Sequence, residues 1–198
     1  MQQEAKQLTT IVDDNPRAIV AARMMSRGYA PVLLRPRSKV PLLSAWQKDP
    51  VDCAVWLEED PSLNLGWRQG LQPNGKRLLA VDDDGGLQKL VETLGVLPPT
   101  WEQLTPSGGR HLVYRVPVGA KLSNRVRVAG QAVDVRCDGG FIAIAPSELE
   151  AGVYRVTNQG PLVDLPERWL ACLRAVEPPA PVPLPAHLEP SLERALRY

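Results

Sequence analysis

The stretch "LLAVDDDGG", residues 78–86, places three consecutive aspartates directly after an apolar run. The run is typical of a buried strand, in which successive side chains point to opposite faces of the sheet. Asp82 and Asp84 are therefore expected to share one face, with Asp83 on the other. Adjacent carboxylates repel one another and weaken a strand, so the cluster is either a solvated turn or a group of acids aimed at a positive ligand.

The composition excludes several classes of protein. The 198-residue chain is 44% hydrophobic and 23% charged, with a formal net charge of +1, which is ordinary for one globular domain. Its scattered cysteines form no CxxC pair, which argues against a zinc cluster or a disulfide framework and suits a reducing cytoplasm. No signal-peptide core and no run near the ~20 apolar residues of a membrane helix is present. We therefore expect a cytoplasmic location and no membrane partner.

The order of expected elements favours an α+β fold. Helices are predicted at 15–30, 49–61, 85–99 and 166–176, with Asn15 and either Asp49 or Asp52 at the first two starts. Strands are predicted around 32–34, 63–70 and 76–81, in two pieces each of 101–117 and 131–147, and at 152–157. Trp46 and Trp56 are expected to be core or interface aromatics. The folded domain would span 1–175, followed by a Pro-rich linker at 176–190 and the start of a helix at 191–198.

A third acid stands inside another apolar strand. Asp134 lies between Val133 and Val135, where a charge is costly unless it is paired or exposed. It is either an ion-pair partner of Arg136 or a companion of the acids at 82–84. Carboxylates converging at strand ends are typical ligands of Mg²⁺, which prefers oxygen donors.

The segment "TPSGGRH", 105–111, has the features of an anion-binding loop. Gly108 and Gly109 let backbone N–H groups approach an anion closely, and Ser107 adds a hydroxyl donor. His111 opens the next strand, from which it could donate to a phosphate oxygen. The alternatives are a flexible turn and a structural histidine. Lys39, in a Pro-punctuated basic loop, is a further candidate cation.

Six short motifs occur in a fixed order along the chain: Lys39-x-Pro41 with Trp46 downstream, "NLGWRQG" (64–70), Asp82-x-Asp84, "TPSGGRH", "VDVRCDGGFIAIAPS" (133–147) and "LPERWL" (165–170). Together they resemble the N-terminal primase–polymerase domain of the archaeo-eukaryotic primase superfamily, as found in bifunctional plasmid and phage replication proteins. The similarity spans about residues 16–174. The resemblance implies a small N-terminal α/β part packed on an antiparallel sheet like that of an RNA-recognition motif.

The resemblance also implies roles for individual residues. Asp82, Asp84 and Asp134 would be the catalytic acids and the ligands of two divalent ions, Mg²⁺ or Mn²⁺. His111 and Arg136 would contact the nucleoside triphosphate, and further expected triphosphate contacts are Lys39, Ser107, Gly108 and Gly109. Asp83 departs from the family pattern, in which this position is usually apolar, and we expect it to face solvent or to support its neighbours.

The implied activity is template-dependent DNA primase/polymerase synthesis by two-metal catalysis in plasmid, phage or mobile-element replication. Expected partners are a single-stranded DNA template, a primer strand, an NTP or dNTP, and a C-terminal helical or helicase domain absent from this chain. Basic residues expected to follow the template backbone, or else to form a solvated face, are Arg110, Arg115, Lys121, Arg125 and Arg127. Alternatives are a metal-dependent nuclease, which could use the same acids, and a non-catalytic single-strand-binding or replication-initiator module, which the 5% aromatic content disfavours.

Overall fold

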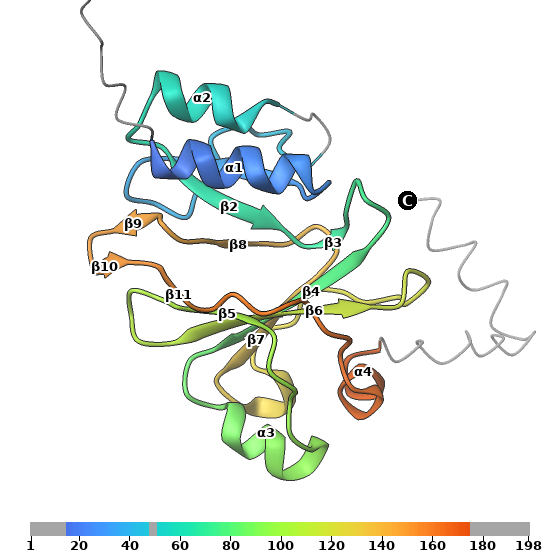
Figure 1. Cartoon of the computed structure of the whole chain (residues 1–198). Helices are drawn as coiled ribbons and strands as arrows, with labels where there is room; N and C mark the ends of the chain where they lie inside the picture. The colour runs from blue at the N-terminus through green and yellow to red at the C-terminus, as the bar shows by residue number, and fades with distance from the viewer. Residues whose placement is uncertain (1–14, 48–50, 175–198) are drawn as a thin grey trace, which may run out of the picture.

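The computed structural model describes residues 15–47 and 51–174 and shows an α+β fold, as predicted (Figure 1). Its elements in chain order are α1 Pro16–Ser26, β1 Pro31–Leu34, α2 Cys53–Glu59, β2 Asn64–Arg68, β3 Gly70–Leu71, β4 Arg77–Asp83, α3 Leu87–Leu94, β5 Trp101–Leu104, β6 Arg110–Val116, the 3-10 turn η1 Val128–Gly130, β7 Val133–Arg136, β8 Phe141–Ala143, β9 Glu148–Leu149, β10 Gly152–Val153, β11 Arg155–Asn158 and α4 Glu167–Leu173. The predicted linker at 176–190 and helix start at 191–198 lie outside the described residues.

Two antiparallel sheets organise the fold. A three-stranded sheet, in the order β1-β2-β8, lies beside α1 and α2, and a six-stranded sheet has the order β11-β5-β6-β4-β3, with β7 also paired to β4. The path β4-α3-β5-β6-η1-β7 follows the β-α-β-β-α-β pattern, with the second helix reduced to η1. This arrangement agrees with the antiparallel sheet that the family resemblance implied.

The strand β4 separates two hydrophobic cores. Leu79 and Val81 face the core closed by α3 and α4, whereas Leu78 and Ala80 face the core shared with α1, α2, β2 and β8. All four side chains are fully buried. The same alternation continues into the acids, so Asp82 faces the side of α1 and α2 and Asp83 faces the side of α3.

The first two helices begin at capping residues. The Asn15 side chain accepts a hydrogen bond from the Arg17 backbone N–H, which confirms the predicted start of α1. For α2 the cap is Asp52, which accepts from two backbone N–H groups; Asp49 lies outside the described residues. Trp46 packs edge-to-face against Phe141, with ring centroids 5.1 Å apart, as expected of a core or interface aromatic.

Three expectations about elements were wrong. Of the two roles expected for Trp56, the core role was wrong, because the side chain is 41% exposed and only Cys53 and Leu57 of α2 are buried; the interface role stays a prediction. The helix predicted at 85–99 ends at Leu94. Gly95 leaves the helical conformation with φ +89°, and its N–H donates a hydrogen bond to the Val91 carbonyl. The strand predicted to stop at residue 81 continues through Asp83, because both of its neighbours, β6 and β7, extend the pairing.

Candidate active site

Four polar side chains form a row across the six-stranded sheet. His111 on β6 and Asp134 on β7 are the direct cross-strand neighbours of Asp82 on β4, and Gln103 on β5 is the neighbour of His111. Residues directly opposite in antiparallel pairs place their side chains on the same face. These residues, Gln103, His111, Asp82 and Asp134, are called the polar row below.

The hydrogen bonds of the row fix the orientation of His111. The Gln103 amide nitrogen donates to the Ala143 carbonyl, its oxygen accepts from the Ala145 N–H, and its nitrogen lies 2.8 Å from His111 Nδ1. Because that amide nitrogen is a donor, Nδ1 must accept, which places the proton of a neutral imidazole on Nε2. His111 Nε2 lies 3.2 Å from Asp82 Oδ1, so His111 donates toward the carboxylate.

The charge of Asp82 is maintained by its surroundings. Burial alone would raise the pKa of this carboxyl, but the hydrogen bond and electrostatic attraction from His111, together with the charges of Lys39 and Arg136, outweigh burial and hold the pKa below its usual value. Asp82 is therefore ionised at neutral pH. It lines a cavity of about 290 Å³ together with His111, Lys39, Arg136 and Tyr154.

Asp134 is both opposite Asp82 and paired to a cation. Its Oδ2 accepts from Arg136 Nη2 at 2.9 Å, and its Oδ1 accepts from the Arg127 backbone N–H at 2.9 Å. The ion pair with Arg136, one of the two alternatives at the sequence level, is thus present. It also holds the Arg136 guanidinium at the wall of the Asp82 cavity.

Asp83 has a structural role that the sequence did not reveal. It is 5% exposed, its Oδ1 accepts from the N–H groups of Gly85 and Leu87 at 2.9 Å each, and its Oδ2 accepts from Arg110 Nε at 3.0 Å. The expectation that it faces solvent was wrong, because the strand turns it inward beneath α3. Its alternative role as a support for its neighbours agrees with these contacts.

Asp84 follows the end of β4 and is exposed. Its carboxylate lies against Gly109, where an added Cβ would stand 2.7 Å from Asp84 Oδ1 and 2.7 Å from the Asp83 carbonyl oxygen. This close approach explains why glycine occupies position 109. Gly108, in the same turn, has φ +89°, and Ser107 Oγ lies 3.1 Å from Thr105 Oγ1.

The chemical type of these donor atoms suits a hard divalent cation such as Mg²⁺. Asp82, Asp134 and Asp84 offer carboxylate oxygens, and two of them are cross-strand neighbours. Tyr154, which also lines the Asp82 cavity, has a buried hydroxyl with no hydrogen-bond partner among the described residues. Within 15–47 and 51–174, however, no three His, Cys, Asp or Glu side chains form a metal-ion arrangement. Asp82 and Asp134 instead bind the protein's own His111 and Arg136.

The predicted DNA-contacting residues are dispersed rather than gathered. Arg110 is held by Asp83 on the face opposite the polar row, and Arg115 pairs with Asp164. Arg125 donates to the carbonyls of Cys172 and Arg174. Lys121 is exposed, and Arg127 contributes its backbone N–H to Asp134.

Sequence reasoning missed two residues of the site. Gln103, fully buried, orients His111, and Tyr154 places its ring centroid 5.8 Å from the His111 ring. Gln103 carries no local signal, because its partners Ala143 and Ala145 lie about forty residues further along the chain. No local pattern marks Tyr154, which arrives from a distant segment.

The Asp82 carboxylate, a histidine and two cations line one cavity, and Asp134 is the cross-strand neighbour of Asp82. Groups of these types are the ones that phosphoryl-transfer enzymes use for positioning and charge stabilisation. The sequence model of the family described as "Bifunctional DNA primase/polymerase, N-terminal" matches residues 21–169. The chain belongs to this family, as the six motifs indicated. A comparison with curated proteins found no match. None of the helices in the described residues is long and apolar enough to span a membrane.

Proposed function

We propose that this chain is the catalytic domain of a template-dependent DNA primase/polymerase, with the polar row as its active site. The observation that carries this proposal is the cross-strand placement of His111, Asp82 and Asp134 beside a cavity that Lys39 and Arg136 line. Acids and cations at one cavity suit a ligand that combines phosphates with a divalent metal ion.

The residues divide into two groups by charge. Asp82, Asp84 and Asp134 would hold Mg²⁺ or Mn²⁺. When bound, such ions neutralise charge on the phosphates and lower the pKa of the attacking hydroxyl. Lys39 and the Arg136 guanidinium, which Asp134 holds at the cavity wall, would donate to phosphate oxygens. In this proposal Ser107 and the backbone of Gly108 and Gly109 supply further donors.

His111 would bind a phosphate oxygen through Nε2–H. Gln103 keeps that proton on Nε2 by occupying Nδ1; the Nε2–H donates toward Asp82 in this structure and would turn to a phosphate oxygen once Asp82 holds a metal ion. Such preorganised donors lower the reorganisation needed at the transition state.

The products formed from single-stranded DNA, Mn²⁺ and labelled nucleotides, with and without a primer, test the proposal. We expect products whose sequence is complementary to the template. A metal-dependent nuclease would instead shorten the DNA, and a non-catalytic binding module would leave DNA and nucleotides unchanged. Either of these two results would overturn the proposal.

A further inference from the structure

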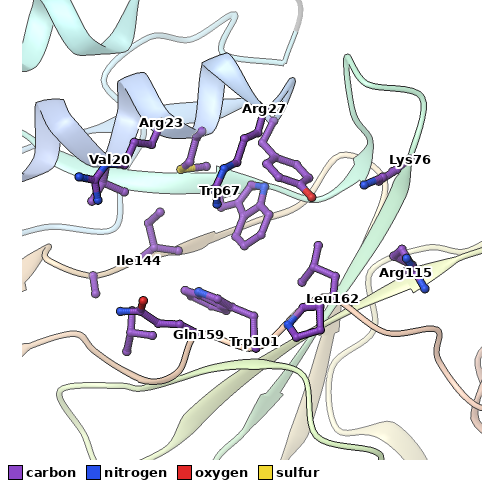
Figure 2. Close-up of a pocket in the computed structure, with 16 residues that line it drawn as sticks. Val20, Arg23, Arg27, Trp67, Lys76, Trp101, Arg115, Ile144, Gln159 and Leu162 are labelled. Atoms are coloured by element: carbon purple, nitrogen blue, oxygen red, sulfur yellow. The ribbon is translucent and has the colours of Figure 1, made fainter.

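A large cavity lies apart from the polar row. It has a volume of about 680 Å³, within the roughly 300–1,000 Å³ typical of small-molecule sites. Figure 2 shows it between α1 on one side and Trp101, Gln159 and Leu162 on the other, with Trp67 and Ile144 between them. It shares no lining residue with the Asp82 cavity. We call it the tryptophan cavity.

Its apolar wall combines aliphatic side chains with three aromatic rings, one of which has an unsatisfied donor. Trp67 contacts Trp101 edge-to-face with centroids 5.4 Å apart, and Tyr29 contacts Trp67 at 5.1 Å. Trp67 is 6% exposed, and its Nε1–H is buried with no hydrogen-bond partner in the part of the chain that the structure describes. Buried donors are normally paired, so this indole N–H is suited to an acceptor supplied from outside.

All the charged side chains that line the tryptophan cavity are cations. Arg23, Arg27, Lys76 and Arg115 line it, and no aspartate or glutamate does. Arg115 pairs with Asp164, whereas the other three make no ion pair within residues 15–47 and 51–174. Like charges around a cavity with apolar walls raise the local concentration of anions.

We propose that the tryptophan cavity binds a nucleotide unit, with its base against the indole rings and its phosphate on the arginines. Aromatic walls accept any base face, and guanidinium groups donate in pairs to phosphate oxygens. The Trp67 N–H is buried in this structure, and a small side-chain movement on binding would let it donate to a base carbonyl or ring nitrogen. The unit is either a free nucleotide or one residue of a single strand. This site does not depend on the proposed catalytic function.

Equilibrium binding in EDTA tests this inference without the carboxylate site's metal. The probes are a fluorescein-labelled oligothymidylate, followed by anisotropy, and free dTMP and dTTP as competitors. The test variant is Arg23→Glu/Arg27→Glu; both side chains are exposed, Arg23 in the last turn of α1 and Arg27 directly after the helix. The matched control is Lys89→Glu/Arg168→Glu, which makes the same charge change on exposed positions of α3 and α4. Circular dichroism melting shows whether each variant is folded.

We expect the Arg23/Arg27 variant to bind the oligonucleotide about 10-fold or more weakly than wild type and to have a shallower dependence on salt. The control should stay within about 2-fold of wild type. Competition by free dTMP or dTTP would assign the cavity to a free nucleotide, and its failure would assign it to a strand. Equal weakening by the two double variants would overturn the inference.

Two further variants separate this cavity from the active site. Trp67→Phe keeps an aromatic ring but removes the N–H, so it should weaken nucleotide binding and leave inorganic triphosphate binding unchanged. Lys39→Glu, which removes a cation from the Asp82 cavity, should weaken oligonucleotide binding in EDTA much less than Arg23→Glu/Arg27→Glu does. Weakening by Lys39→Glu as large as that by Arg23→Glu/Arg27→Glu would place the metal-free binding at the polar row and contradict the proposal. Absence of primer synthesis would refute only the proposed function.

Discussion

Asp83 turns into the face of the sheet that packs against α3, where two backbone N–H groups and Arg110 satisfy its carboxylate. Asp82 turns to the other face and meets His111, while Asp84 is exposed beyond the strand. Three adjacent charges are therefore tolerated because each has its own surroundings, and two have donors that offset their repulsion.

Replacement of Asp83 by alanine should lower stability more than the same change at Asp84. The loss leaves the Gly85 and Leu87 N–H groups and Arg110 without their acceptor, so we expect a decrease of about 2–3 kcal/mol in the free energy of unfolding. Asp84→Ala, at an exposed position, should change it by about 0.5 kcal/mol or less. Urea unfolding measures both. Equal effects would contradict a structural role for Asp83.

Among the polar residues behind the active site, Gln103 should cause the largest loss of stability when it is replaced. Gln103→Leu leaves His111 Nδ1, the Ala143 carbonyl and the Ala145 N–H unsatisfied, so a destabilisation of about 2–4 kcal/mol is expected. The matched control is Gln88→Leu on the exposed side of α3, expected near zero. Thermal or urea unfolding compares them, and a near-neutral Gln103→Leu would refute the proposed hydrogen-bond network.

At the scale of elements, the turn between β5 and β6 packs closely against the end of β4. Gly109 approaches the Asp83 carbonyl and Asp84 carboxylate too closely for a side chain, and the Thr105 N–H binds the Gly109 carbonyl at 2.8 Å. The turn that carries Ser107 and the acids of β4 are thus positioned by one contact.

Gly109→Ala should disturb this contact and lower both stability and activity. Overpacking of this kind costs roughly 1–3 kcal/mol. Gly119→Ala serves as the control, because an added Cβ there meets nothing within 4 Å. Unfolding curves and nucleotide incorporation should both distinguish the two variants. If Gly109→Ala behaves like the control, the turn is not fixed by its approach to β4.

The elements that the sequence predicted well are those whose signals are local. Alternation along β4 gave the faces of Asp82 and Asp83, and the side chains of Asn15 and Asp52 cap the helices as their types suggest. The contacts of Gln103 and Tyr154 depend on segments far apart in sequence, so no spacing predicts them. The burial of Asp83 could not be predicted because its donors come from the turn and from β6.

At the scale of the whole molecule, each of the two cores that β4 separates contains a buried cysteine. Cys53 lies in the core of α1 and α2, and Cys137 in the core of α3 and α4. Burial raises the pKa of Cys53 to about 12 and that of Cys137 to about 11. The thiols of the unfolded chain have a pKa near about 8.5. Below that pH burial of the two neutral thiols therefore does not oppose folding, and the free energy of unfolding falls as pH rises from there toward the pKa values of the folded state.

Labelling with a thiol reagent at pH 8 should therefore report the opening of each core. Cys172, which is only partly buried, should react first in the folded protein, and the two buried cysteines should react only on unfolding. Because β4 contributes to both cores, we expect Cys53 and Cys137 to become reactive at the same urea concentration. Distinct midpoints would show that the two cores unfold separately.

The measurement that tests the central claim most directly is Mn²⁺-dependent, template-directed nucleotide incorporation by Asp82→Asn, with Glu92→Gln on the exposed face of α3 as the matched amide control. If the polar row is the catalytic site, Asp82→Asn should lose about 100-fold or more of the wild-type rate while its circular dichroism spectrum stays native. Glu92→Gln should keep the wild-type rate. Undiminished synthesis by folded Asp82→Asn would contradict the assignment of the active site.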